Sequence, residues 1–331
     1  MTGTSGGASL RALYDVLLLD LDGTVYRGAE AVPGAREALS EGAERLFYVT
    51  NNASRRPAEV AKHLRELGFA ADESNVVTSS QSAARLLAER VPAGAPVLVV
   101  GTGALVDEVA GVGLTPVRSA DAEPVAVVQG HSPETGWAIL AEATLALRSG
   151  ALWVATNVDS TLPTERGLVL GNGSMVAALR SATGCEPLVA GKPAAPLLED
   201  AVVRSGASRP LVVGDRLDTD IAGANAVGAD SLLVLTGVST VADLLRAPEK
   251  QRPTYVADSL AGLDAEAATL RVGPREPGAV SFDGRDVHLA PEFAADPMAA
   301  LRAVLDVAWA NPGFGRVVAA DDLLARWGIS R

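Results

Sequence analysis

Asp20 and Asp22 directly follow an apolar run at residues 16–19, and such a run is typical of a buried parallel strand. On an extended strand, residues two apart point to the same side, so the two carboxylates repel each other. A divalent cation would offset that repulsion, because hard cations such as Mg²⁺ prefer oxygen ligands. Gly23 then allows a sharp turn away from the strand. The pattern predicts a metal-dependent site at a strand end, and the alternative is an Asp-Gly turn with an incidental second aspartate.

Two further segments offer groups that bind anions. Thr50 and Asn51 end the apolar run 46–49, and their hydroxyl and amide can hydrogen-bond an anion without adding charge. The alternative for this pair is a turn that caps a helix. Lys192 stands between a glycine and a proline, where its ammonium can sit on a phosphate as a point charge. The alternative for the lysine is a solvated place on the surface.

A second strand-like run, residues 211–214, leads into Asp215, and Asp218 and Asp220 follow at the start of a predicted helix. Acidic residues early in a helix are ordinary, because the helix dipole and capping favour them. Asp215 ends the strand itself, which is the less ordinary position. If the sheet brings Asp20 and Asp215 side by side, the two carboxylates form a cleft suited to Mg²⁺.

The elements that must position these groups alternate between strand-like and helix-like stretches. Strands are predicted at residues 15–20, 45–50, 96–101, 124–129, 152–156, 210–214 and 231–235. Helices are predicted near 34–42, 57–67, 80–90, 103–110, 134–148, 174–183, 194–204 and 218–227. This alternation favours parallel sheets covered by helices. The expected fold class is therefore α/β, with a doubly wound, Rossmann-like parallel-sheet core.

The length of 331 residues is enough for about two domains. The stretch between Thr50 and Lys192 is too long for a simple crossover. We therefore expect a catalytic core at 1–80 and 187–268, with an α/β cap domain inserted at 81–186. A Gly- and Pro-rich linker at 273–278 opens onto a small α+β appendage at 274–331. Its own apolar core would be marginal, so the appendage should pack on the main body or on a second subunit.

Composition narrows the function classes. The formal charge of −12 disfavours binding to nucleic-acid phosphates, which needs clustered lysine and arginine. The sequence has neither an apolar stretch long enough to cross a bilayer nor a signal-peptide pattern at its start, so a cytoplasmic protein is expected. The lone Cys185 excludes a disulfide within one chain.

Together, the four segments resemble the motifs of haloacid-dehalogenase-superfamily phosphatases, and more narrowly the subclass with a large C2a-type α/β cap. That subclass includes phosphoglycolate, glycerol-3-phosphate, pyridoxal-phosphate and nucleotide phosphatases. The resemblance covers about residues 13–260, and the appendage departs from the simplest members. The residues that carry the resemblance are Asp20-Leu21-Asp22-Gly23-Thr24, Val49-Thr50-Asn51-Asn52, Gly191-Lys192-Pro193 and Gly214-Asp215-Arg216-Leu217-Asp218-Thr219-Asp220.

The resemblance implies how the carboxylates would act. Asp20 would be the nucleophile that forms an aspartyl-phosphate. Asp22 would protonate the leaving oxygen and then activate water. Mg²⁺ would be held by the Asp20 carboxylate, the Asp22 backbone carbonyl and Asp215. Asp220 would support this group by positioning a metal-bound water or the active-site lysine.

The same resemblance implies that Lys192, the Thr50 hydroxyl and the Asn51 amide would share the charge on the phosphoryl oxygens. The substrate would then be a small phosphate monoester held beside the metal.

The polar stretch at 155–167 follows a predicted strand and resembles the substrate-specificity loop of the capped subclass. Asn157, Leu162, Thr164 and Glu165 are its candidate substrate contacts, and the alternative is a solvated loop. Only 4% of the residues are aromatic, which disfavours stacking on a pyridine ring or base. A small aliphatic ester is therefore expected, glycerol 3-phosphate first and 2-phosphoglycolate second. His131 follows another strand-like run, and its role is left open.

Other functions stay open at this point. A pyridoxal-phosphate or nucleotide phosphatase belongs to the same subclass. A non-catalytic phosphate-binding signalling protein would also carry strand-end aspartates, a threonine and a lysine around Mg²⁺, but it would lack the acid/base Asp22. A homodimer is one assembly that the sequence leaves open.

Overall fold

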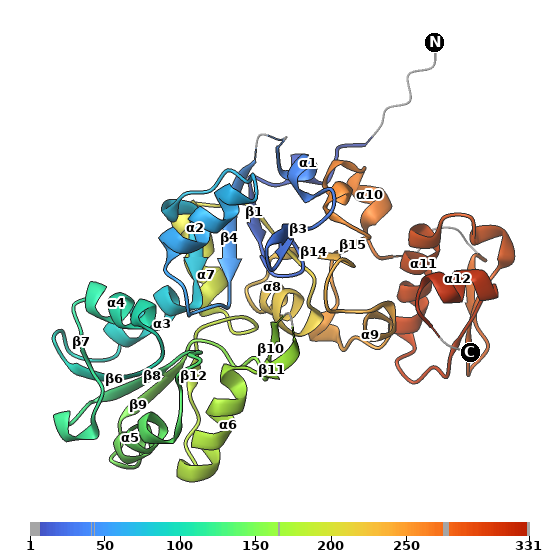
Figure 1. Cartoon of the computed structure of the whole chain (residues 1–331). Helices are drawn as coiled ribbons and strands as arrows, with labels where there is room; N and C mark the ends of the chain where they lie inside the picture. Colours follow the sequence, from blue (N-terminus) through green and yellow to red (C-terminus); the bar gives the residue numbers. More distant parts are fainter. Residues whose placement is uncertain (1–6, 41, 43, 165, 274–277, 330–331) are drawn as a thin grey trace. The chain divides into compact units, whose positions relative to one another are not determined.

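The computed structural model describes residues 7–40, 42, 44–164, 166–273 and 278–329 (Figure 1). Contacts within the chain divide it into two compact units, residues 1–46 with 206–331 and residues 47–205. The expected domain limits, 1–80 with 187–268, then 81–186 and 274–331, remain predictions. None of the helices in the described parts of the chain is long and apolar enough to cross a membrane.

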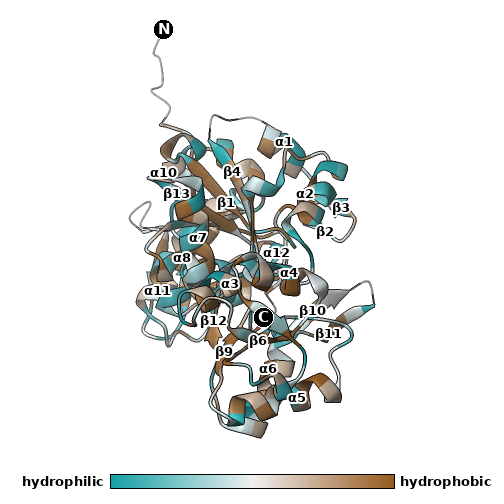
Figure 2. Ribbon diagram, turned by 90° about the vertical axis from the view of Figure 1, so that its left-hand side faces the viewer, coloured by the Kyte–Doolittle hydropathy of each residue, from teal (hydrophilic) through white to brown (hydrophobic). Residues whose placement is uncertain are grey.

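The first unit contains parallel strands in the order β15-β14-β13-β1. These are β1 (Val16–Leu19), β13 (Pro210–Gly214), β14 (Asp230–Val234) and β15 (Tyr255–Ala257). Every residue of β1 is buried, and Figure 2 shows β1 and β13 in brown. A parallel sheet covered on both faces requires such continuous apolar runs. The register pairs Leu19 with Val213, so β1 and β13 end at the same edge of the sheet.

Shorter elements complete the main body of the first unit. They include β2 (Tyr26–Arg27), β3 (Glu30–Ala31), α1 (Ala35–Ser40), the π-helical turn η4 (Leu217–Ile221), α8 (Ala222–Ala226), α9 (Val241–Leu245) and α10 (Ala267–Leu270).

The C-terminal segment (residues 278–329) belongs to this unit as well. Its elements are β16 (Val280–Phe282), β17 (Val287–Leu289), α11 (Pro297–Ala310), β18 (Val317–Val318) and α12 (Asp321–Arg326). The segment shares one apolar cluster with α9, so it packs on the main body, the first of the two expected alternatives. The linker residues 274–277 lie outside the described residues.

The second unit has a five-stranded parallel sheet in the order β12-β9-β8-β6-β7. Its strands are β6 (Pro96–Val100), β7 (Thr115–Val117), β8 (Ala126–Gln129), β9 (Leu152–Ala155) and β12 (Leu188–Val189). In addition β4 (Arg45–Thr50), which begins in the first unit and ends in the second, pairs in parallel with β5 (Val76–Thr78).

Helices cover both faces of the five-stranded sheet. Val99 and Val128 share an apolar cluster with α3 (Ser79–Ala88) and α4 (Gly103–Gly111). Their neighbours Leu98 and Val127 enter a different cluster with α5 (Trp137–Arg148) and α6 (Asn172–Thr183). Because successive strand residues point to opposite faces, two clusters mean two helical layers. The unit also contains α2 (Pro57–Glu66) and α7 (Pro196–Ser205). The expected α/β class with parallel sheets is confirmed.

One stretch differs from its prediction. The polar residues at 155–167 were expected to form a loop, but they include β10 (Thr161–Thr164), which pairs antiparallel with β11 (Gly167–Leu170). The proline at position 163 disfavours the prediction of a strand at this stretch. It is tolerated here because β10 and β11 form a two-stranded sheet, so β10 has an open edge.

Candidate active site

Three carboxylates gather where β1 and β13 end. The ligand atoms of Asp20, Asp215 and Asp220 all lie within 4.8 Å of one another. Asp215 is 0% exposed and Asp220 is 1% exposed. Carboxylates this close and this buried repel one another strongly when ionised, and a hard divalent cation offsets that cost. A donor set of carboxylate oxygens therefore fits Mg²⁺.

The turn after β1 shapes the space around Asp215. The backbone N–H of Asp20 donates to the Val213 carbonyl at 2.9 Å, which extends the ladder by one residue. Gly23 has a φ of +93°, and a Cβ there would lie 2.7 Å from Oδ2 of Asp215. A side chain at this position would be strained and would displace the carboxylate. The Thr24 hydroxyl donates to Asp215 Oδ1 at 3.3 Å.

Asp22 differs from the grouped carboxylates because its side chain is exposed. Its predicted metal contact is the backbone carbonyl, and its predicted acid/base role needs a side chain that can exchange protons with a leaving group and with water. Both roles stay predictions. In the described part of the chain, the acidic side chains grouped for a metal are those of Asp20, Asp215 and Asp220.

The turn after β13 places Asp218 and Asp220 in different surroundings, although both were predicted at the start of one helix. In η4, Asp220 faces inward, and its Oδ2 accepts the Arg216 backbone N–H at 3.1 Å. Asp218 instead pairs with the Arg216 guanidinium through contacts of 2.8 and 3.0 Å. Burial alone would raise the pKa of Asp218, but the hydrogen bond and charge of Arg216 more than offset burial, and the pKa is lowered. Asp220, expected only to support the site, therefore also offers a direct ligand atom.

Lys192 is buried in the second unit, three residues after the end of the short strand β12. It is 2% exposed, and its Nζ donates to the Val49 carbonyl at 3.0 Å. This burial excludes the solvated surface lysine that the sequence left open. Because an ammonium in such a position is costly without compensation, its placement favours a role in holding an anion.

Both polar atoms of the Asn51 side-chain amide form hydrogen bonds with the backbone of Lys192. Its Oδ1 accepts the Lys192 backbone N–H at 2.8 Å, and its Nδ2 donates to the Lys192 carbonyl at 2.9 Å. The same Nδ2 lies 3.2 Å from Oδ2 of Asp159. Thr50, at the end of β4, is 3% exposed, and its hydroxyl oxygen accepts the Asn52 N–H at 3.1 Å. The contact of the Asn51 amide with a phosphate therefore stays a prediction that competes with these bonds.

Asn51→Ala is expected to lower kcat/KM by about 10- to 100-fold, because Lys192 loses the amide that holds its backbone. Two backbone groups of Lys192 also lose their partners, which should lower the free energy of unfolding by about 1–3 kcal/mol. Steady-state kinetics and thermal unfolding measure both effects. Asn75→Ala is the matched control, since it removes one side-chain bond to the backbone of Asp72 in an exposed turn. Unchanged kinetics in Asn51→Ala would contradict the expectation.

The candidate substrate contacts of the second unit have different surroundings. Asn157 is 5% exposed, and its amide donates to the Asn51 carbonyl at 2.7 Å. Leu162 is half-buried on β10, and Thr164 is the last residue of that strand. The side chain of Thr164 lies outside the described residues. Glu165 lies outside the described residues. Burial lowers the pKa of His131, which favours a neutral imidazole at neutral pH.

Sequence reasoning missed Asp159 and Asn172. Asp159 contacts the Asn51 amide, and Asn172 donates to the Asn157 carbonyl at 2.7 Å. Asp159 lies in the polar stretch at 155–167, whereas Asn172 lies beyond it, at the start of α6. The spacing of polar residues in a loop gives no sign of which side chain turns back toward the strand ends.

This fold and these groups define a metal-dependent α/β enzyme that acts on an anionic substrate. The chain belongs to the haloacid dehalogenase-like hydrolases. The family described as haloacid dehalogenase-like hydrolase matches residues 17–115, and the family described as HAD-hydrolase-like matches residues 189–263.

Several phosphatases are similar to this chain. A D-glycerol 3-phosphate phosphatase of Mycobacterium tuberculosis is 50% identical over 340 residues, which covers 98% of this chain and 96% of the relative. A crystal structure of a glycerol phosphate phosphatase from the same organism, in complex with magnesium, is 51% identical and has a TM-score of 0.93, covering 98% of this chain and 100% of that one. An acid sugar phosphatase of Staphylococcus aureus is 37% identical over 248 residues, or 73% of this chain and 93% of the relative. These relationships confirm the expected family, the α/β fold and the expected enzyme class, a phosphoric monoester hydrolase.

Proposed function

We propose that the protein is a Mg²⁺-dependent phosphatase that hydrolyses glycerol 3-phosphate through an aspartyl-phosphate on Asp20. The observation that carries this proposal is the grouping of Asp20, Asp215 and Asp220 at the strand ends of the first unit. Such a group favours the binding of a cation, and the cation in turn favours an anionic substrate. The similarity to a D-glycerol 3-phosphate phosphatase along 98% of this chain supports the substrate.

In the proposed reaction, a carboxylate oxygen of Asp20 attacks phosphorus, and the bond from phosphorus to the ester oxygen breaks. Asp22 gives its proton to that leaving oxygen, which releases the alcohol. Asp22 then takes a proton from water, and the resulting hydroxide attacks phosphorus and breaks the bond to Asp20. The products are inorganic phosphate and the original Asp20 carboxylate.

Mg²⁺ held by Asp20, Asp215 and the Asp22 carbonyl, with Asp220 as a direct or water-mediated ligand, would supply positive charge to the phosphoryl oxygens. Lys192 and the Thr50 hydroxyl contribute hydrogen bonds to the same oxygens. For Asn51, the bonds to Lys192 support a holding role.

The proposed substrate is small and aliphatic. The chain is only 4% aromatic, which offers little surface for stacking on a ring. Asn157, Leu162, Thr164 and Glu165 stay the proposed contacts to the alcohol part of the ester. 2-Phosphoglycolate is the second candidate, because its small carboxylate replaces the hydroxyls of glycerol. A cytoplasmic location and a homodimer are also proposals.

A panel of phosphate esters assayed with Mg²⁺ and with EDTA tests this function. We expect the highest kcat/KM for glycerol 3-phosphate and loss of turnover in EDTA that added Mg²⁺ restores. The panel includes 2-phosphoglycolate, pyridoxal phosphate and a nucleoside monophosphate. A much higher kcat/KM for either of the last two would overturn the proposed substrate. A single slow turnover with stable labelling of Asp20 would instead favour the signalling protein.

A further inference from the structure

The loop after β14, residues 236–240, encloses the Asp215 carboxylate. The Val238 backbone N–H donates to Asp215 Oδ2 at 2.6 Å, and the Ser239 N–H donates to the Asp215 backbone carbonyl at 3.1 Å. A Cβ on Gly237 would collide with the same carboxylate, so the backbone of the loop approaches it closely. The 236–240 loop therefore fixes both the main chain and the side chain of a proposed metal ligand.

The 236–240 loop is also tied to the two turns that carry the other acidic residues. The Thr236 hydroxyl donates to the carbonyl of Gly23, the residue after Asp22, at 2.7 Å. The Ser239 hydroxyl accepts the backbone N–H of Leu217 at 2.9 Å, where η4 begins. A displacement of this loop would therefore disturb the geometry of the whole acidic group.

The loop leads directly into α9, a helix too short to be stable without tertiary packing. It spans only Val241–Leu245, and Thr240 and Asp243 cap its first turn. A helix of this length is not stable in water by itself, so packing must hold it. Leu244 and Leu245 are 0% and 5% exposed, and the side chains that bury them therefore determine where the loop lies.

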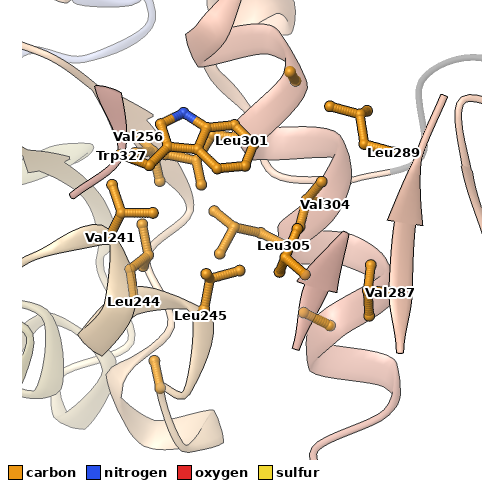
Figure 3. Packing of buried hydrophobic residues seen from close by; sticks show 14 of the residues in the cluster. Val241, Leu244, Leu245, Val256, Val287, Leu289, Leu301, Val304, Leu305 and Trp327 are labelled. Carbon is orange, nitrogen blue, oxygen red and sulfur yellow. The ribbon is translucent and has the colours of Figure 1, made fainter. Parts of the chain in front are cut away.

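The C-terminal segment supplies much of that packing. Figure 3 shows Leu305 of α11 directed toward Leu244 and Leu245 of α9. The cluster that joins them also contains Val256, Val287, Leu289, Leu301, Val304 and Trp327.

Polar contacts fix the same junction. The Trp309 indole N–H donates to the Leu244 carbonyl at 2.9 Å, which satisfies one of the last carbonyls of α9. The Arg246 guanidinium donates to the carbonyls of Phe314 and Gly315, and it lies 3.8 Å from the centre of the Phe314 ring. The end of α9 is therefore held by backbone and side-chain groups of the C-terminal segment.

We propose that the C-terminal segment is a positioning element of the metal site, which acts by holding α9 and thereby the 236–240 loop against Asp215. The inference rests on the proposed Mg²⁺-dependent function. The residues proposed for the chemical steps lie at positions 20–220, outside this segment, so the role proposed for the segment is positioning. Partners that orient a metal ligand commonly contribute 10- to 100-fold to metal affinity.

Two variants of the full chain test the inference. Trp309→Phe removes the indole N–H and keeps an aromatic ring, and Leu305→Ala opens the apolar contact with α9. Isothermal titration of Mg²⁺ without substrate should give a dissociation constant about tenfold higher than that of the wild type for each. Activity at limiting Mg²⁺ should fall in parallel, and saturating Mg²⁺ should restore kcat.

A matched control separates positioning from general stability. Leu179→Ala removes the same atoms from a 1% exposed position in the α5 and α6 cluster of the second unit. It should lower the melting temperature as Leu305→Ala does and leave Mg²⁺ affinity unchanged. If Leu305→Ala fails to fold, Trp309→Phe carries the test.

Wild-type Mg²⁺ affinity in the folded variants, or an equal loss of affinity in the control, would overturn the positioning role. If the wild type itself neither bound Mg²⁺ nor released phosphate, the proposed function would be wrong, and this inference with it.

Discussion

Asp20→Asn is expected to lower kcat by about 10⁴-fold or more and to leave the protein folded. The change replaces the carboxylate proposed to attack phosphorus by an amide, which is a poor nucleophile. It also removes one of three crowded negative charges, so the melting temperature without Mg²⁺ should stay the same or rise. Phosphate release from glycerol 3-phosphate and thermal unfolding measure the two effects.

Asp258 provides the matched control for this change. It also directly follows a parallel strand of the first unit, β15, but its side chain is exposed. Asp258→Asn should therefore leave both kcat and the melting temperature close to those of the wild type. Comparable turnover in Asp20→Asn and wild type would rule out a covalent step at Asp20.

The sequence predicts the central strands well because a buried parallel strand has little freedom in composition. Residues 16–19 and 211–214 are continuous apolar runs, and both are buried strands. The apolar runs also predict where the strands end. The first polar residue after each run is Asp20 or Asp215, and both belong to the group of carboxylates that could hold a metal ion. The shorter strands β5, β7, β12 and β15 have two or three residues, too few for a periodic pattern.

The orientation of individual side chains could not be predicted in the same way. Asp218 and Asp220 have the same residue type in the same stretch, and only the π-helical turn directs one toward Arg216 and the other inward. Asn51 posed a similar problem. Its position after Thr50 suggested a phosphate contact, whereas its partner Lys192 lies 141 residues away in the sequence. Such pairings depend on tertiary packing, which local patterns do not encode.

Replacing Lys192 by methionine should show how the buried ammonium affects catalysis and how it affects the free energy of unfolding. Lys192→Met keeps a long unbranched side chain at a position that is 2% exposed, and it abolishes the charge. We expect kcat/KM to fall by about 10²- to 10³-fold, because the phosphoryl oxygens lose a buried positive charge in a region of low dielectric. Stability should fall by about 1–3 kcal/mol at most, because the Val49 carbonyl loses its donor while a buried charge no longer has to be desolvated.

The chain contains only two other lysines, Lys62 and Lys250, and Lys62 serves as the control position for this prediction. Lys62→Met changes a side chain that is 71% exposed and makes one weak ion pair with Glu66, so its kinetics should match the wild type. Lys192→Arg should restore little activity, because the planar guanidinium is larger than the ammonium and the site is closely packed. A large loss of stability in Lys192→Met without a matching loss of kcat/KM would assign this lysine to the fold instead. The combination expected here, a large loss of activity with at most a modest loss of stability, is characteristic of a buried charge retained for its substrate.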